Sequence, residues 1–412
     1  MKLFRPYLDW IETQYEGMVT DLVRLANLNS GSDNLAGLER LAAELSQLFG
    51  SLDGETQRVA LESIVRIGTD GELQTCELGP LLRLHKHPDA PVRVLLVGHM
   101  DTVFGAGHAF QRAERIDTMR LKGPGVADLK GGLLVMFTAL AALERSPWAG
   151  RLGWEVLLNP DEELGSPGSA AHLDAAAKRN HFGLIYEPAM ADGAFAAARK
   201  GSGNFTAVVR GRSAHAGREH HLGRNALRAA ADFVAAIDEL NARRPGLTIN
   251  PGFIHSGGPV NVVPDLAVVR FNIRLCDPQD EHWVLARLEA IGREINARDG
   301  ITLALHGAFG RKPKVLDAAH RQLFERVRHC GQKLGLSISW RDTGGCCDGN
   351  NLSAAGLPNI DTMGVIGGGL HSAEEYVELP SLIERSRLSA LLLLGLASGR
   401  LDLEHTRGNG PA

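Results

Sequence analysis

The sequence is poor in the features that direct a chain to an oxidising compartment, to nucleic acid or to a membrane. It has five cysteines among 412 residues and no C-x-x-C pair, which favours reduced thiols over a disulfide scaffold. Lys and Arg number 44 against 48 Asp and Glu, so we expect no basic surface for a nucleic-acid backbone. No stretch approaches the roughly 18 consecutive apolar residues of a membrane span, and the first residues lack a signal-peptide layout. We therefore expect a cytoplasmic protein without nucleic-acid or membrane partners.

The rest of the composition is that of a globular chain. Hydrophobic residues make up 44% and charged residues 22% of the sequence, values that exclude a disordered protein. The length predicts two or three domains. The polar, glycine-rich tail after Leu403 is expected to lack regular structure.

The order of apolar segments predicts an α/β protein with an insertion. Continuous apolar strands alternate with helical segments, a pattern typical of a sheet covered on both faces. Between them the order changes to strand-helix-strand-strand-helix-strand, as in ferredoxin-like folds. We predict a doubly wound, mostly parallel sheet in a domain of two parts, 1–197 and 313–412, with an inserted α+β domain at 198–312. The expected strands of the larger domain are 92–97, 154–158, 182–186 and 360–365, and those of the insertion are 205–209, 247–254, 268–275 and 301–305.

Acidic and imidazole side chains follow the strands of the predicted larger domain. In open α/β sheets, ligands bind beyond the carboxyl ends of the strands, so we expect these side chains to meet at one edge. One further acid stands in a glycine-rich turn between the first two strands. The residues are His99, Asp101, Asp128, Glu162, Glu163, Glu187 and His371.

Imidazoles and carboxylates together are the ligand set of Zn²⁺ and related ions. The two histidines with Asp128, Glu163 and Glu187 make five ligands, too many for one open tetrahedral site. Five ligands suit two metals that share one bridging carboxylate. Asp101 lies two residues after His99 in an extended segment, so it can orient that ring.

The adjacent pair Glu162 and Glu163 offers two different roles. In an extended segment neighbouring side chains point apart, so one can ligate while the other stays free as a general base.

Several motifs occur here in the order of the di-zinc aminoacylase/carboxypeptidase family. The sequence resembles that family over nearly its whole length and most resembles its glutamate carboxypeptidase branch, which includes the folate-cleaving enzymes. The segments that carry the resemblance are 99–103, 123–132, 162–166, 187–188, 211–217 and His371.

The resemblance implies a zinc-peptidase-like catalytic domain with two Zn²⁺ ions per chain, for which Co²⁺ or Mn²⁺ can substitute. Asp128 is then similar to the carboxylate that bridges both metals. His99 and Glu187 resemble the other ligands of one metal, and Glu163 and His371 resemble those of the second.

The resemblance also implies catalytic and substrate-binding roles. Glu162 resembles the general base of amide hydrolysis, with Asp101 as the residue that orients the neighbouring histidine. The insertion is similar to the family's lid and dimerisation domain, and His215 resembles the oxyanion donor of that domain, which the partner subunit often supplies. Asn261 and Arg274 resemble substrate contacts, with the arginine on a substrate carboxylate.

These features predict a homodimeric, metal-dependent hydrolase that releases a C-terminal amino acid from a small acyl-amino-acid or peptide substrate. An N-acyl-amino-acid deacylase or a dipeptidase of the same family is the near alternative. A catalytically silent binding homologue and a nicotinamide-dependent oxidoreductase are the distant alternatives.

The sequence departs from the carboxypeptidase branch in two places. That branch has a lysine soon after its Glu-Pro motif, whereas residues 189–195 contain none, and Arg199 and Lys200 are the nearest cations. The pair Cys346-Cys347 stands where the family has small or hydroxyl residues.

Overall fold

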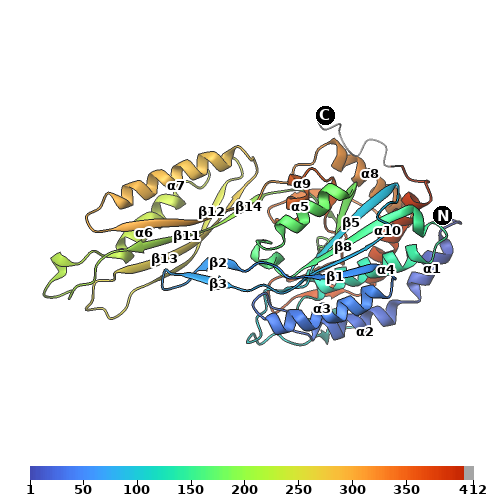
Figure 1. The fold of residues 1–412 in the computed structure, drawn as a ribbon, viewed down its shortest axis with the longest axis horizontal. Coiled ribbons are helices and arrows are strands. Elements are labelled where there is room, and N and C mark those ends of the chain that lie inside the picture. The colour runs from blue at the N-terminus through green and yellow to red at the C-terminus, as the bar shows by residue number, and fades with distance from the viewer. Residues whose placement is uncertain (403–412) are drawn as a thin grey trace.

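The computed structural model describes residues 1–402, and the tail expected after Leu403 lies outside them. Two units lie side by side along the long axis of the molecule (Figure 1). The large unit contains both the first and the last described residues. The small unit consists of the strands and helices between Gly201 and Arg311, so the chain leaves the large unit once and returns to it.

A six-stranded mixed sheet forms the centre of the large unit. In sheet order, its strands are β1 (Glu55–Val59), β4 (Leu81–Lys86), β8 (Leu152–Asn159), β5 (Val92–His99), β9 (Phe182–Ile185) and β16 (Asn359–Ile360). The pairs β8–β5, β5–β9 and β9–β16 are parallel, whereas the pairs β1–β4 and β4–β8 are antiparallel. Every residue of β8 is buried because helices cover both faces. The predicted doubly wound, mostly parallel α/β fold is confirmed.

Two layers of helices enclose this sheet, and alternate residues of a strand face different layers. Val94 and Leu96 of β5 pack in the larger core, whereas Leu95 and Val97 pack in the smaller core on the opposite face. This alternation follows from the two-residue period of a strand. The larger layer contains α1 (Arg5–Glu12), α2 (Tyr15–Ala26), α3 (Leu35–Gly50), α4 (Gly131–Glu144), α8 (Ala318–Lys333) and α10 (Pro380–Ala397), and the smaller contains α5 (Ala170–Arg179) and α9 (Asp348–Ala354).

One segment of the described chain, Val126–Glu144, is long and apolar enough to cross a membrane by length and composition alone. It joins the π-helical turn η1 (Val126–Lys130) to α4, and its mean hydropathy is 1.7. Because 89% of it is buried and α4 packs against α10 and α1, its apolar character belongs to the protein core.

The small unit is an antiparallel sheet with helices on one face. Its strands, in sheet order, are β12 (Thr248–Ser256), β13 (Leu266–Leu275), β11 (Gly201–Arg210) and β14 (Thr302–Arg311), and its helices are α6 (Ala226–Asp238) and α7 (Asp280–Asn296). The chain order β-α-β-β-α-β is ferredoxin-like. β11 and β12 lead away from the large unit, and β13 and β14 lead back to it. The loops 211–225 and 257–265 therefore lie at the far end (Figure 1).

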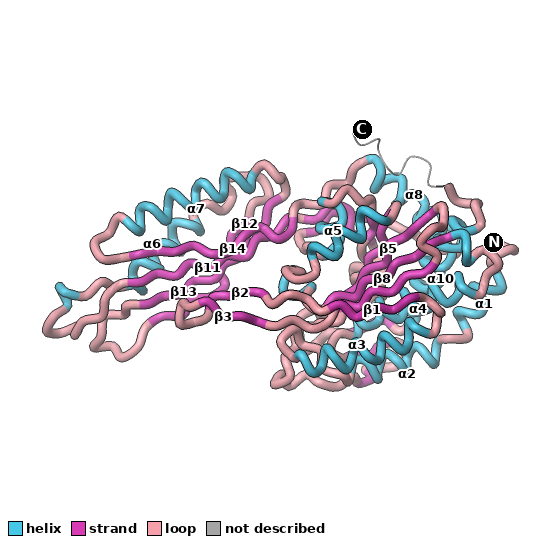
Figure 2. The backbone as a smooth tube through the Cα atoms, in the orientation of Figure 1, coloured by secondary structure: helices cyan, strands magenta, loops and turns pink. Residues whose placement is uncertain are grey.

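A β-hairpin of the large unit extends along the small unit. Its strands are β2 (Ile64–Ile67) and β3 (Leu73–Cys76), and Figure 2 shows it beside the small unit's sheet. Ile67 is buried with Val208 and Val268 in a separate apolar cluster. At the hairpin turn, Arg210 of β11 donates to the Gly71 carbonyl at 3.1 Å. The hairpin therefore connects the large unit to the small unit through non-covalent contacts.

One predicted strand is shorter than expected. Instead of spanning 360–365, β16 ends at Ile360, and the chain turns at Thr362, whose φ is 67°. This turn leads the chain towards the loop that carries His371. Further short strands that the sequence pattern did not predict are β6 (Glu114–Arg115), β7 (Arg120–Lys122), β10 (Phe195–Arg199), β15 (Trp340–Thr343), β17 (Gly367–Gly368) and β18 (Tyr376–Glu378).

The close contact between α4 and the end of β9 can be tested at one glycine. A Cβ on Gly132 would lie 2.1 Å from the carbonyl oxygen of Tyr186, so Gly132→Ala must separate the two elements. We expect a loss of about 1–3 kcal/mol in the free energy of unfolding. Gly17 of α2 has no atom within 4 Å of that position, so Gly17→Ala should stabilise by about 0.5–1 kcal/mol. Thermal denaturation checks both, and a stable Gly132→Ala protein would contradict this packing.

Candidate active site

The polar side chains predicted at the strand ends converge on one edge of the large sheet. His99 is the last residue of β5, and Glu162 and Glu163 begin the short helix η3 (Glu162–Leu164) after β8. Glu187 follows β9 by two residues, and Asp128 lies in η1. His371 comes from the loop between β17 and β18.

Two groups of possible metal ligands share Asp128. In the first group, His99 Nε2 lies 3.1 Å from Asp128 Oδ1 and 3.8 Å from Glu187 Oε1. In the second group, His371 Nε2 lies 3.4 Å from Asp128 Oδ2 and 3.3 Å from Glu163 Oε2. Asp128 thus offers a different oxygen to each group. Within each group the ligand atoms lie within 4.8 Å of one another.

The charges at this edge fit bound cations. Glu187 is buried, and its Oε1 has no hydrogen-bond partner among the described residues. Burial raises the pKa of Glu187 well above its usual range, and the negative charges of Asp128 and Glu162 raise it further. Buried carboxylates of like charge are costly unless a positive group neutralises them. Imidazole and carboxylate donors in this arrangement suit divalent metals such as zinc.

Asp101 connects the two strand ends. His99 Nδ1 lies 3.0 Å from the Asp101 carbonyl oxygen, which leaves Nε2 directed at Asp128. The carboxylate of Asp101 accepts the backbone N–H groups of Glu162 and Glu163, each at 3.1 Å, and the hydroxyl of Ser32 at 2.8 Å. The same aspartate therefore orients the histidine and holds the Glu-Glu turn in place.

Glu162 belongs to neither ligand group and is paired with a residue that the sequence analysis missed. Burial raises the pKa of Glu162 to about 7, while the Arg311 guanidinium acts in the opposite direction. Arg311 Nη2 lies 2.8 Å from Glu162 Oε1 and 3.2 Å from Asp348 Oδ1, and it donates to the Ser166 hydroxyl at 2.8 Å. Arg311 is the last residue of β14 in the small unit, so it does not follow a strand of the large sheet. The sequence alone therefore gives no sign that Arg311 lies beside Glu162.

A second missed residue, Glu375, holds the loop that carries Asp128. Its carboxylate accepts the backbone N–H groups of Gly125, Ala127 and Asp128 at 3.0, 2.9 and 3.0 Å. Burial raises the pKa of Glu375 to about 7, and the charge of Asp128 contributes to the increase. Glu375 lies four residues after His371, so one loop supplies both a possible ligand and a support for the shared aspartate.

Comparison with known proteins assigns the chain to a family. The family described as Peptidase family M20/M25/M40 matches residues 95–395. The chain belongs to this family. The resemblance and the hydrolase activity class predicted from the motifs are thereby confirmed.

Members of the family align over most of the chain. Carboxypeptidase G2 from Pseudomonas sp. (strain RS-16) is 29% identical over 317 residues, which cover 74% of this chain and 74% of that protein. A succinyl-diaminopimelate desuccinylase from Nitrosospira multiformis is 24% identical over 386 residues, covering 89% of this chain and 98% of that protein. The fold matches the YXEP protein of Bacillus subtilis, described as a dinuclear metal binding peptidase from the M20 family. That match has a TM-score of 0.62 at 13% identity and covers 93% of this chain and 99% of that one.

Three residues in the small unit of this M20 protein are predicted to act on the substrate, and they lie at opposite ends of the sheet. They are Arg274, His215 and Asn261. Arg274, near the end of β13, donates to Asn272 Oδ1 at 2.7 Å and lies 2.7 Å from Cys346 Sγ of the large unit. No carboxylate of the described residues forms an ion pair with Arg274, whose Nε and Nη1 are engaged by Asn272 and Cys346. His215 and Asn261 lie at the far end, where Ala216 N–H donates to the Asn261 carbonyl at 2.9 Å.

His215 is too far along the sheet to reach the metal-ligand groups of its own chain. It follows the end of β11, and the ten residues of that strand span about 30 Å at the usual rise per residue. The structure thus brings Arg274 to the boundary of the large unit and leaves His215 and Asn261 apart from it.

The two cations nearest the Glu-Pro motif are already engaged. The side chain of Arg199 is 9% exposed, and its Nη2 lies 2.9 Å from Asp361 Oδ1. Lys200 donates from Nζ to the Gly246 carbonyl at 2.7 Å. Cys347 caps the start of α9, where the N–H of Gly349 lies 3.3 Å from its sulfur. Arg199 and Lys200 are therefore both held by contacts within the chain, and Cys347 serves as a helix cap.

The support that Glu375 gives to Asp128 predicts a metal-binding defect. In Glu375→Gln an amide NH₂ replaces one oxygen that faces backbone N–H donors, so the Asp128 loop should shift. We expect affinity for Zn²⁺ to fall by about 10–100-fold, measured by titration against a competing chelator. Glu374 is exposed and pairs with Lys122 at 2.8 Å, so Glu374→Gln is the matched control and should bind normally. Equal affinities in the two variants would rule out this role.

Proposed function

We propose that the protein is a two-zinc amidohydrolase that releases an amino acid with a free carboxylate from an acyl or peptide substrate. The observation that carries this proposal is the pair of ligand groups sharing Asp128, beside a buried carboxylate, Glu162, that belongs to neither group. Membership of the M20 family supports it.

The proposed ligands follow the two groups. Asp128 would bridge both ions, His99 and Glu187 would complete one site, and Glu163 and His371 would complete the other. Bound there, zinc ions supply Lewis acidity, which lowers the pKa of water and polarises a carbonyl group. Co²⁺ or Mn²⁺ accepts the same donors.

Glu162 is proposed to move the proton. A carboxylate whose pKa lies near 7 can accept a proton from the attacking water and return it to the leaving amine. Arg311 holds Oε1 of Glu162 at 2.8 Å and so fixes the side chain that performs both transfers. Asp101 fixes its backbone through the N–H at 3.1 Å.

The proposed substrate is an acyl-amino acid or a small peptide. Arg274 lies at the boundary between the units without a carboxylate partner among the described residues, so it suits the carboxylate of the released amino acid. The relatives named carboxypeptidase and desuccinylase support hydrolysis of an acyl–nitrogen bond. A carboxypeptidase acting on acyl-glutamates is our first choice, and an N-acyl-amino-acid deacylase or dipeptidase is the alternative.

We also propose that residues 198–312 form a lid and dimerisation domain. The distance of about 30 Å along β11 supports a role for His215 in the site of a partner subunit, as an oxyanion donor beside Asn261. The protein would then work as a homodimer. Its five cysteines are unpaired, which supports a cytoplasmic location.

The role of Glu162 can be separated from metal binding. Glu162→Gln should lower kcat by at least about 100-fold, because the proton acceptor is lost while both ligand groups remain. Zinc content, measured by elemental analysis, should equal that of wild type. The substrates are N-acyl-glutamates, acetylated amino acids and dipeptides. Turnover confined to acyl-glutamates supports a carboxypeptidase, turnover elsewhere supports the alternative, and a fully active variant would contradict the proposed base.

Sharing of His215 between subunits can be tested by mixing two inactive variants. The His215→Ala variant retains Glu162 in its own site. The Glu162→Gln variant retains the histidine that it would supply to the site of its partner. Random pairing makes about half of the dimers mixed, with one working site in each, so activity should recover to about a quarter of wild type. The measurement is activity after joint refolding, beside each variant refolded alone. A mixture no more active than its components would show that His215 does not act across subunits.

A further inference from the structure

A large cavity extends from Glu163, a member of one metal-ligand group, into the space between the hairpin β2–β3 and the small unit. Its volume is about 800 Å³, and Glu163 lies at one of its walls. The sheet of the small unit forms a second wall and the hairpin a third. Apart from Glu163, none of its lining residues has been assigned so far to the reaction.

The wall formed by the small unit is the polar face of its sheet. Phe205 and Phe271 pack on the opposite face, in the core with α6 and α7. Their neighbours Asn204 and Asn272 are paired across β11 and β13 and therefore point away from that core. Arg270 lies two residues before Asn272, on the same polar face.

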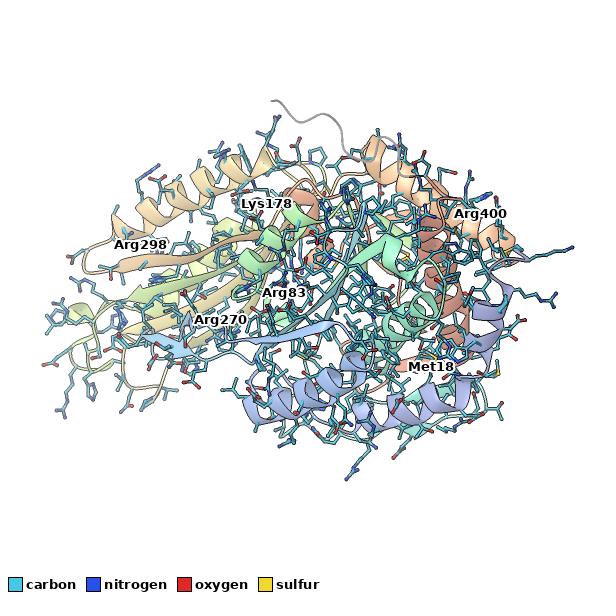
Figure 3. All side chains as sticks on the ribbon, turned by 45° about the vertical axis from the view of Figure 1, so that its right-hand side comes forward. Met18, Arg83, Lys178, Arg270, Arg298 and Arg400 are labelled. Carbon is cyan, nitrogen blue, oxygen red and sulfur yellow. The ribbon has the colours of Figure 1, made fainter. Side chains whose placement is uncertain are left out.

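Two arginines from different units line the cavity. Arg270 donates to the carbonyl of Ile67 in the hairpin at 2.9 Å and lies 4.8 Å from the ring centre of Phe253. Figure 3 labels Arg270 where the small unit meets the hairpin. Arg66 of β2 is exposed and forms no ion pair within residues 1–402. It also lines a second cavity, of about 530 Å³, that likewise reaches Glu163.

The cavity therefore presents positive charge and amide donors. Of its lining residues, Glu163 is the sole carboxylate, and that residue belongs to a metal-ligand group. The lining also contains the amide side chains of Gln74, Asn204, Asn250 and Asn272, together with apolar residues such as Val65, Leu164 and Phe253. Guanidinium and amide groups together are suited to bind a carboxylate.

The cavity is placed to receive the acyl side of the substrate. Arg274, which is proposed to bind the carboxylate of the released amino acid, and Arg311, which holds Glu162, are both absent from its lining. We infer that this cavity binds the acyl group, and that the preferred acyl group carries a carboxylate of its own, held by Arg66 and Arg270. This inference rests on the proposed function, because it assumes that an acyl–nitrogen bond is cleaved beside Glu163.

Matched pairs of substrates test the charge preference. Glutaryl and adipoyl amides of one amino acid are compared with their glutaramoyl and adipamoyl counterparts, which replace the distal carboxylate by a neutral amide of the same shape. We expect kcat/KM to favour the charged member of at least one pair by about 10-fold or more. Equal values, or a preference for the neutral member in both pairs, would overturn the inference.

The substitution Arg66→Gln tests whether Arg66 is responsible for the charge preference. Because Arg66 is exposed and has no ion pair among the described residues, the variant should fold normally, and its melting temperature checks this. We expect it to lose the preference for the charged substrate, mainly through KM, while the neutral substrate is unaffected. Arg40, an exposed residue of α3 that lines neither cavity, gives the control Arg40→Gln.

Binding to the metal-free protein provides a readout that does not require turnover. Calorimetry should show the charged member of a pair binding about 10-fold more tightly than the neutral member in wild type, and equally in Arg66→Gln. If no substrate is hydrolysed by metal-loaded protein, the proposed function fails. If neutral and charged substrates are hydrolysed and bound equally well, the function stands and the inference fails.

Discussion

Asp128 offers one carboxylate oxygen to His99 and the other to His371, and this shared position constrains the surrounding loops. The aspartate must be buried and held in a single orientation between two strand ends. Its own backbone is held by Glu375, which accepts the N–H of Asp128 itself and those of two preceding residues. Gly125 precedes this turn with φ of 71°, a conformation that glycine adopts without strain.

The same position explains why the site is unfavourable for the chain alone. Glu187, Glu163 and Asp128 are carboxylates close together in a protein interior, and burial raises the pKa of Glu187 and of Glu163. A cation bound there would offset this repulsion and would therefore stabilise the folded chain. Without a cation, His99 and His371 are the groups that offset the charge of Asp128, which lowers the pKa of this aspartate.

The residues that could be predicted from the sequence are those that directly follow an apolar strand. Strands buried on both faces are visible as continuous apolar runs, so the positions of His99, Glu162 and Glu187 at their carboxyl ends could be anticipated. Arg311 and Glu375 could not, because their roles depend on contacts between segments about 150 and 250 residues apart. The hairpin β2–β3 was missed for a different reason: its strands are short and mostly exposed, so they leave no apolar run.

The hairpin changes how the small unit can move. Two covalent crossings, before Gly201 and after Arg311, attach the small unit to the large one, and the hairpin adds a third connection at Ile67. Rotation about the two crossings would separate Ile67 from Val208 and Val268 unless the hairpin moves as well. Because its apolar contacts lie with the small unit, the hairpin is expected to follow that unit. The polar face of the sheet and Arg66 would then keep their relative positions while their distance from Glu163 changes.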